Sequence, residues 1–102
     1  MQATLETVEV KSLLKTLETA DNRTKNEIEN MMVTLGKDVI PELVSYLQVI
    51  KGTVRGVVAM VLIRIGSDSI VHLKKAAQLN KDFEWMAQYL ISEIDCPVRV
   101  AA

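Results

Sequence analysis

The stretch IRIGSDSIVHL at residues 63–73 repeats the pattern of VTLGKDVIPEL at residues 33–43, thirty residues earlier. Glycine, aspartate, isoleucine and leucine occupy the same places in both stretches, and the match continues through the residues that follow. The identical pairs are Gly36 and Gly66, Asp38 and Asp68, Ile40 and Ile70, Leu43 and Leu73, Gln48 and Gln78, and Lys51 and Lys81. Such a fixed period indicates a repeat architecture.

The apolar residues of each unit follow the period of a helix. Val10, Leu13 and Leu17 are spaced i, i+3, i+7, and residues 28, 31, 32 and 35 are spaced i, i+3, i+4, i+7. The sequence therefore predicts an all-α protein, an α-solenoid of three stacked antiparallel helix pairs. We expect one domain over residues 1–102, with units at about 6–35, 36–65 and 66–95 and a tail at 96–102. The six helices are expected at about 4–20, 24–35, 38–50, 54–65, 68–79 and 82–94.

Glycine, proline and hydroxyl residues mark the predicted helix ends. Three glycines stand where a helix would end in a left-handed residue: Gly36, Gly52 and Gly66. Thr53 and Ser67 then stand as N-caps of the helices that follow. Pro41 falls in the first turn of its helix, where a missing N–H is tolerated.

The run VVAMVLI at residues 57–63 has a competing interpretation as a buried β-strand, because it is rich in β-branched residues. Its apolar positions match those of the helical segments thirty residues away on either side, and no second strand is available to pair with it. We therefore favour a helix.

Composition narrows the class of protein. The chain has 102 residues, enough for one modest core, and its apolar fraction of 49% is ordinary for a globular protein. The net charge of −1 argues against nucleic-acid binding, which usually needs a basic face. No apolar run is long enough to cross a membrane, no secretory leader is visible, and the single Cys96 fits a reducing compartment. We expect a cytoplasmic protein.

The segment LGKDVIPELVSYL at residues 35–47, followed by GTVRGVVAMVLIRIG at 52–66, resembles the HEAT repeat. The match is to the short form, about 30 residues long, found in phycobilisome-lyase-type HEAT-like proteins. The resemblance implies an α-solenoid that serves mainly as a binding scaffold. It also implies an alternative function, because some relatives take part in attaching or detaching bilin chromophores.

On the second helix of each unit, the positions that are not expected in the core form a candidate partner-binding surface. In the resembled family these helices line the concave side of the stack. Apolar and aromatic residues with small ones between them would form a shallow groove there. The candidates are Arg55, Gly56, Ala59, Met60, Ile63, Trp85, Gln88 and Tyr89. An alternative remains open, in which these residues pack on each other or beneath the tail.

The C-terminal end is a second candidate surface. The helix expected at 82–94 carries many apolar residues and has no evident polar cap after it: Phe83, Trp85, Met86, Tyr89, Leu90 and Ile91. Either Val98 and Val100 of the tail cover this end, or a second copy of the chain does. The second possibility predicts a homodimer.

No constellation of catalytic residues is visible. His72 is the only histidine and falls in an outward polar column, so a solvated surface residue is expected. A metal site needs several ligands, and Cys96 has no base placed beside it. We expect neither an enzyme nor a cofactor. The leading function is a non-enzymatic adaptor for a protein partner, and the alternative is an accessory role in a bilin lyase-type assembly.

Overall fold

The fold is taken from a computed structural model, which describes residues 10–95. This part of the chain is helical and contains no strand, so the predicted all-α class is confirmed. Residues 57–63 lie inside a helix, which rejects the strand interpretation. The α-helices are α2 (Val10–Leu17), α3 (Asn22–Leu35), α4 (Ile40–Leu47), α5 (Gly52–Ile65), α6 (Asp68–Leu79) and α7 (Glu84–Asp95). Two short 3-10 helices, η1 (Gly36–Val39) and η2 (Lys81–Phe83), precede α4 and α7.

Several helix boundaries differ from the predicted ones. The first predicted helix was expected to reach residue 20, but α2 ends at Leu17 and residues 18–20 form turns with i→i−3 bonds. The start of that prediction, at 4–9, lies outside the described residues. Before α4 the chain forms η1, because Pro41 has no N–H to donate to the carbonyl of Lys37. The Ile40 N–H donates to that carbonyl instead, in an i→i−3 bond.

The glycine predictions are confirmed in part. Gly36 and Gly66 have φ of 70° and 92° and follow the last residues of α3 and α5, as expected. Gly52 also has a positive φ of 69°, but it is the first residue of α5. Thr53 is consequently inside the helix, so its predicted N-cap role is wrong.

Side-chain capping occurs at residues that the sequence analysis did not select. Ser67 precedes α6 but forms no capping hydrogen bond, because its backbone is already helical. The hydroxyl of buried Ser69 donates to the carbonyl of Leu62 at 2.9 Å. At α3 the carboxylate of Asp21 accepts from the backbone N–H of Thr24 at 2.9 Å, the arrangement of an N-cap.

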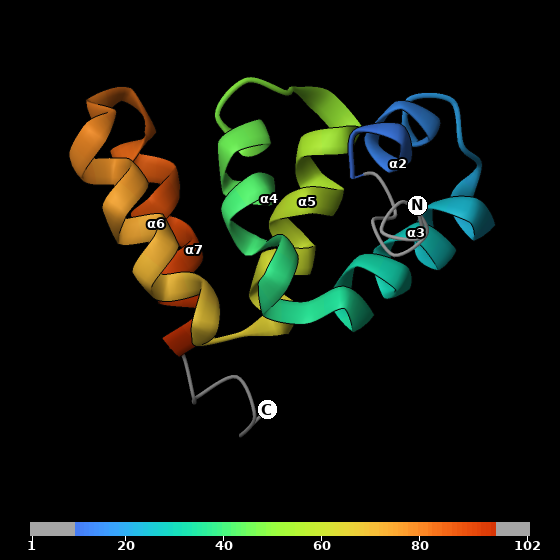
Figure 1. The fold of residues 1–102 in the computed structure, drawn as a ribbon. Helices are drawn as coiled ribbons and strands as arrows, with labels where there is room; N and C mark the ends of the chain where they lie inside the picture. The colour runs from blue at the N-terminus through green and yellow to red at the C-terminus, as the bar shows by residue number, and fades with distance from the viewer. Residues whose placement is uncertain (1–9, 96–102) are drawn as a thin grey trace, which may run out of the picture.

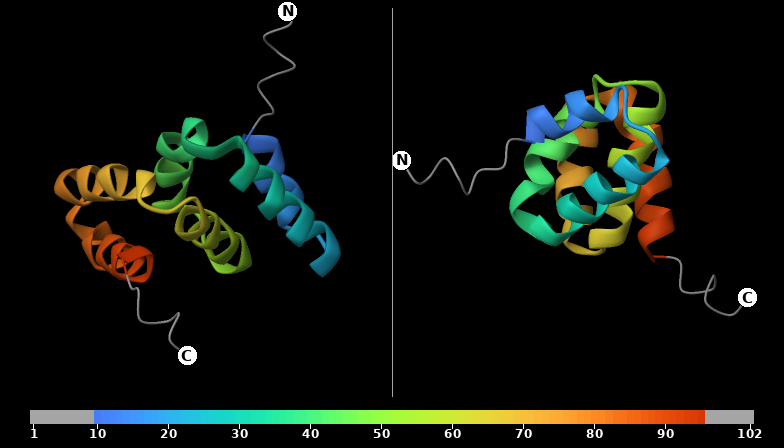
Figure 2. Two further views of the ribbon diagram at one scale, coloured as in Figure 1. Left: turned by 90° about the horizontal axis from the view of Figure 1, so that it is seen from below. Right: turned by 90° about the vertical axis from the view of Figure 1, so that its right-hand side faces the viewer.

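Neighbouring helices pack in pairs and in two rows (Figures 1 and 2). Helix α2 contacts α3, α4 contacts α5, and α6 contacts α7. Between pairs, α5 contacts both α3 and α7, and α4 contacts α6. One row is therefore α3–α5–α7, with α5 in the middle, and the other contains α4 and α6.

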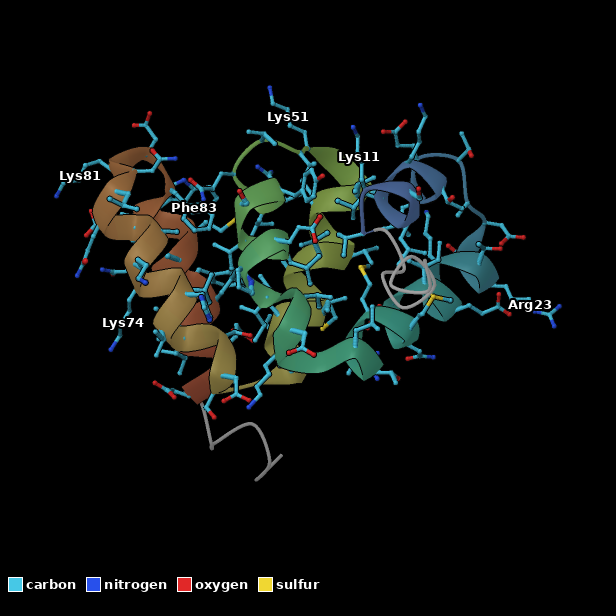
Figure 3. The ribbon with its side chains drawn as sticks, in the orientation of Figure 1. Lys11, Arg23, Lys51, Lys74, Lys81 and Phe83 are labelled. Atoms are coloured by element: carbon cyan, nitrogen blue, oxygen red, sulfur yellow. The ribbon has the colours of Figure 1, made fainter. Side chains whose placement is uncertain are left out.

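One apolar core runs through these pairs. Each α-helix contributes a large side chain that is almost completely buried: Leu17, Met32, Leu43, Leu62, Leu73 and Leu90. Figure 3 shows labelled lysines such as Lys51 and Lys74 pointing away from the helices, whereas Phe83 lies among neighbouring side chains. Helix α5 is flanked on two sides, so Val58, Val61 and Leu62 are inaccessible to solvent. The row α3–α5–α7 positions the residues of the candidate site.

Candidate functional site

Large apolar side chains are exposed on helices α5 and α7. Met60 on α5 is 44% exposed, while Trp85 and Tyr89 on α7 are 65% and 57% exposed. Trp85 and Tyr89 are four residues apart and therefore lie on one face of α7, one turn from each other. Such residues are normally buried when a core is available, so this surface can bury more area against a partner.

A groove of about 280 Å³ lies between the two helices. We call it the α5–α7 groove, and its lining residues are Gly52, Arg55, Gly56, Ala59, Trp85, Met86, Tyr89 and Leu90. Met86 and Leu90 also belong to the core and are 9% and 1% exposed, so the groove lies against a packed core. Five of the eight candidate residues from the sequence line it: Arg55, Gly56, Ala59, Trp85 and Tyr89.

The other three candidates lie elsewhere. Met60 is exposed on α5 but does not line the groove. Ile63 is half-buried and packs against the core. Gln88 is exposed and lines the groove between α6 and α7, and it also lines a second groove together with Trp85. These three residues share the predicted helical rows with the groove residues, but they do not line the α5–α7 groove.

Gly56 is the only glycine that is both inside an α-helix and free of a positive φ among residues 10–95. A Cβ atom added at Gly56 would meet no heavy atom within 4 Å, so neighbouring protein does not require the glycine. Glycine within a helix costs about 1 kcal/mol relative to alanine. The absent side chain therefore leaves open space in the groove at a cost in stability.

The three arginines of residues 10–95 differ in their partners. The guanidinium of Arg64 on α5 contacts α3, with its Nη1 2.9 Å from Glu29 Oε2 and 2.8 Å from Asn30 Oδ1. Arg23 lies 3.8 Å from Glu27 in an exposed i,i+4 pair. Arg55 is half-buried in the groove and makes no hydrogen bond or ion pair within residues 10–95. Among the described residues, it is also the only charged one that lines the α5–α7 groove.

Sequence reasoning missed the bond between Arg64 and Asn30, although a signal was present. Asn30 and Met60 are equivalent positions thirty residues apart, and Arg64 lies four residues beyond Met60. Arg64 has a long side chain and lies one turn after Met60 on α5, so it can reach Asn30 on the neighbouring helix α3. A second missed contact joins the ends of two other helices, where Asn80 Nδ2 donates to Gln48 Oε1 at 2.9 Å.

The C-terminal end is less apolar than the sequence suggested. Phe83, Met86 and Leu90 are buried in the core, because α6 and α5 already pack on them. A groove of about 450 Å³ between α6 and α7 remains, which we call the terminal groove. Its lining residues are Lys74, Ala77, Gln78, Lys81, Glu84, Ala87, Gln88, Ile91 and Ser92. The predicted tail cover, including Val98 and Val100, lies outside the described residues.

Within residues 10–95, no three or more histidine, cysteine, aspartate or glutamate side chains are grouped so that they could hold a metal ion. His72 is half-buried, not fully solvated, and lines a shallow groove between α4 and α6. The pKa of Asp21 is lowered, chiefly because its carboxylate accepts the backbone hydrogen bond from Thr24. Cys96 lies outside the described residues. None of the described helices combines the length and apolar character that a bilayer-spanning segment requires.

Comparisons with protein-family models, with curated proteins and with solved structures found no match to this chain. The geometry of the α5–α7 groove and the composition of its lining therefore carry the functional argument.

Proposed function

We propose that this protein is a non-enzymatic interaction module that binds a protein partner through the α5–α7 groove and the exposed residues beside it. The observation that carries the proposal is the exposure of Trp85 and Tyr89 over an open groove. Aromatic residues dominate the binding energy of many protein interfaces, because they bury large areas with few rotatable bonds. Met60 is exposed on α5 outside the groove lining, and its flexible side chain is a second apolar contact that a partner can use.

The proposed architecture is a short HEAT-like α-solenoid of six helices in three stacked pairs. Two observations support it: helices that are adjacent in the chain contact each other, and α5 contacts the second helix of the pair on either side. In a solenoid, each pair buries its apolar face against its neighbours and one face of the stack stays available for binding. The row α3–α5–α7 would supply that face.

Affinity capture from the native cell tests the proposal. The bait is the full chain, compared with a double variant, Met60→Asp with Trp85→Ala. We expect at least one partner bound by the wild-type chain to be lost by the double variant, because the apolar contact area is removed and a charge is introduced. Val71→Asp is the matched control, since Val71 is 64% exposed on α6, outside the groove. Retention of every partner by the double variant would contradict the proposal.

The bilin-handling alternative predicts a different signal. A chain that holds a bilin shifts the visible absorption of the chromophore when the two are mixed, whereas a protein adaptor leaves the spectrum unchanged. We expect an unchanged spectrum with the wild-type chain. A shift that Trp85→Ala removes would favour the alternative.

A second copy of the chain is the proposed occupant of the terminal groove. Ala77 and Ile91 give this groove small and apolar walls, with Lys74 and Lys81 and the acidic Glu84 at its margins. Opposite charges on one surface allow two copies to face each other with complementary pairs. Light scattering over a range of concentrations is expected to detect a dimer that Ile91→Asp dissociates. A monomer at every concentration would rule it out.

A further inference from the structure

Two features of the α5–α7 groove indicate what chemistry its partner presents. Gly56 leaves open space where any other residue would place at least a Cβ atom. Arg55, the adjacent residue, brings to the same groove a positive charge that has no ion pair within residues 10–95. The first feature concerns shape and the second concerns charge, so each supports a conclusion independently of the other.

The space at Gly56 suits one inserted side chain. The groove volume of about 280 Å³ falls just below the range of about 300–1,000 Å³ that is usual for small-molecule pockets. The groove is lined by Trp85, Tyr89 and Ala59, and by the buried Met86 and Leu90. A leucine, phenylalanine or similar apolar side chain of a partner would find apolar contacts there.

The side chain of Arg55 has no hydrogen-bond or ion-pair partner within the described part of this chain. Arg64 shows how an arginine of the same helix is satisfied when an acid is available, since it binds Glu29 at 2.9 Å. Among residues 10–95, no aspartate or glutamate lines the α5–α7 groove. A half-buried arginine side chain beside apolar residues favours a carboxylate, which it can bind with two parallel N–H···O bonds.

We propose that the α5–α7 groove binds a peptide segment of a partner protein that carries an acidic residue close to a large apolar residue. The apolar side chain packs over Gly56 between Trp85 and Ala59, and the carboxylate pairs with Arg55. This inference rests on the proposed function and specifies the partner that it requires. The charge complementarity is with the groove itself, because the whole chain has a net charge of −1 and would repel an acidic peptide weakly.

Selection from a phage library of random dodecapeptides on the immobilised full chain tests the inference. Selected peptides are synthesised and titrated while the fluorescence of Trp85 is followed, since it is the only tryptophan of the chain and is exposed. We expect the selected peptides to share an acidic residue near leucine, phenylalanine or tryptophan. Binding is expected to shift the Trp85 emission to shorter wavelength, because the indole leaves water.

Matched variants separate charge from shape. Arg55→Ala is expected to weaken binding about tenfold, whereas Arg23→Ala removes the same charge from an exposed site on α3 and leaves affinity unchanged. Replacing the peptide carboxylate by its amide is expected to cost the same factor, with no further loss in Arg55→Ala. Gly56→Leu fills the groove and is expected to abolish binding, while Ser12→Leu on exposed α2 does not. Circular dichroism and urea unfolding verify that each variant remains folded.

The outcomes distinguish the inference from the function on which it rests. If Gly56→Leu abolishes binding but Arg55→Ala behaves like Arg23→Ala, the groove is a binding site and the acidic partner is wrong. If selected peptides bind Gly56→Leu as tightly as wild type, both the groove and the acidic partner are wrong. A selection that yields no binding peptide overturns the inference as well.

Discussion

The two interfaces that α5 forms within the row α3–α5–α7 differ in how their polar groups are satisfied. At the α3–α5 interface, the guanidinium of Arg64 reaches across to Glu29 and Asn30 at 2.9 and 2.8 Å. At the α5–α7 interface, Arg55 has no such acceptor within residues 10–95, and Trp85 and Tyr89 are exposed beside it. The same helix thus closes one interface with its own bonds and leaves a groove at the other.

The contrast shows that packing between neighbouring helices does not give α5 two equivalent surfaces. Both interfaces bury apolar residues of α5. What distinguishes them is a few substitutions on equivalent positions, where polar Asn26 and Asn30 on α3 correspond to Gly56 and Met60 on α5. The surface becomes polar and paired toward α3, and apolar with space toward α7.

The largest expected effect comes from breaking both interfaces together. Leu62→Ala removes a fully buried side chain of α5, and we expect it to lower the free energy of unfolding by about 2–5 kcal/mol. Met60→Ala in the same helix is the control, and its expected effect is below about 0.5 kcal/mol because Met60 is partly solvated. Urea unfolding followed by circular dichroism measures both. Equal losses would show that α5 is not central to the core.

Two glycine substitutions, one inside α5 and one directly after it, are expected to change the free energy of unfolding in opposite directions. Gly66→Ala places a Cβ at a φ of 92°, and we expect a loss of about 2 kcal/mol. Gly56→Ala places a Cβ in open space in a helix, and we expect a gain of about 0.5–1 kcal/mol. Thermal unfolding of the two variants gives the comparison. Destabilisation by Gly56→Ala would mean that the glycine is needed by the fold and not by a partner.

The ion pair between Arg64 and Glu29 across the α3–α5 interface is expected to contribute little to the free energy of unfolding. A double-mutant cycle on Arg64 and Glu29, each replaced by alanine, is expected to give a coupling of about 0.5 kcal/mol. The value is small because the two side chains are 41% and 19% exposed, so water screens the pair. Added salt should reduce the coupling further. A coupling that salt leaves unchanged would indicate a bond shielded from solvent.

The smallest expected effect concerns the N-cap of α3. Hydrogen bonding to Thr24 lowers the pKa of Asp21 in the folded chain, so Asp21 adds stability at neutral pH. That contribution is expected to fade as the pH drops below about 3.9, the ordinary aspartate value, and through the lowered pKa of the folded state. Asp21→Asn retains a capping oxygen without this titration. Urea unfolding as a function of pH compares the two chains, and parallel profiles would contradict the expectation.

Most of the helical pattern could be predicted from the sequence, and five of the eight candidate residues line the α5–α7 groove. The thirty-residue spacing of Gly36 and Gly66 and the helical period of the apolar residues depend on local backbone geometry, which sequence reports directly. The predicted helix ends were less accurate. Gly52 and Thr53 are compatible with two different starts of α5, and the structure begins the helix at Gly52. The predicted rows of second-helix residues also included Ile63 and Gln88, but neither residue lines the α5–α7 groove in the structure.

Residues close together in the chain account for which segments become helices, where most of these helices end and which of their faces are apolar. Which apolar residues remain exposed and which charges are paired follows instead from the packing of helices against each other. Trp85 lies only two residues after Phe83, yet Phe83 is 4% exposed and Trp85 is 65% exposed. Phe83 belongs to η2, which packs against α6, whereas Trp85 lies on α7 beside the α5–α7 groove, so the packing between elements decides which of the two side chains is buried.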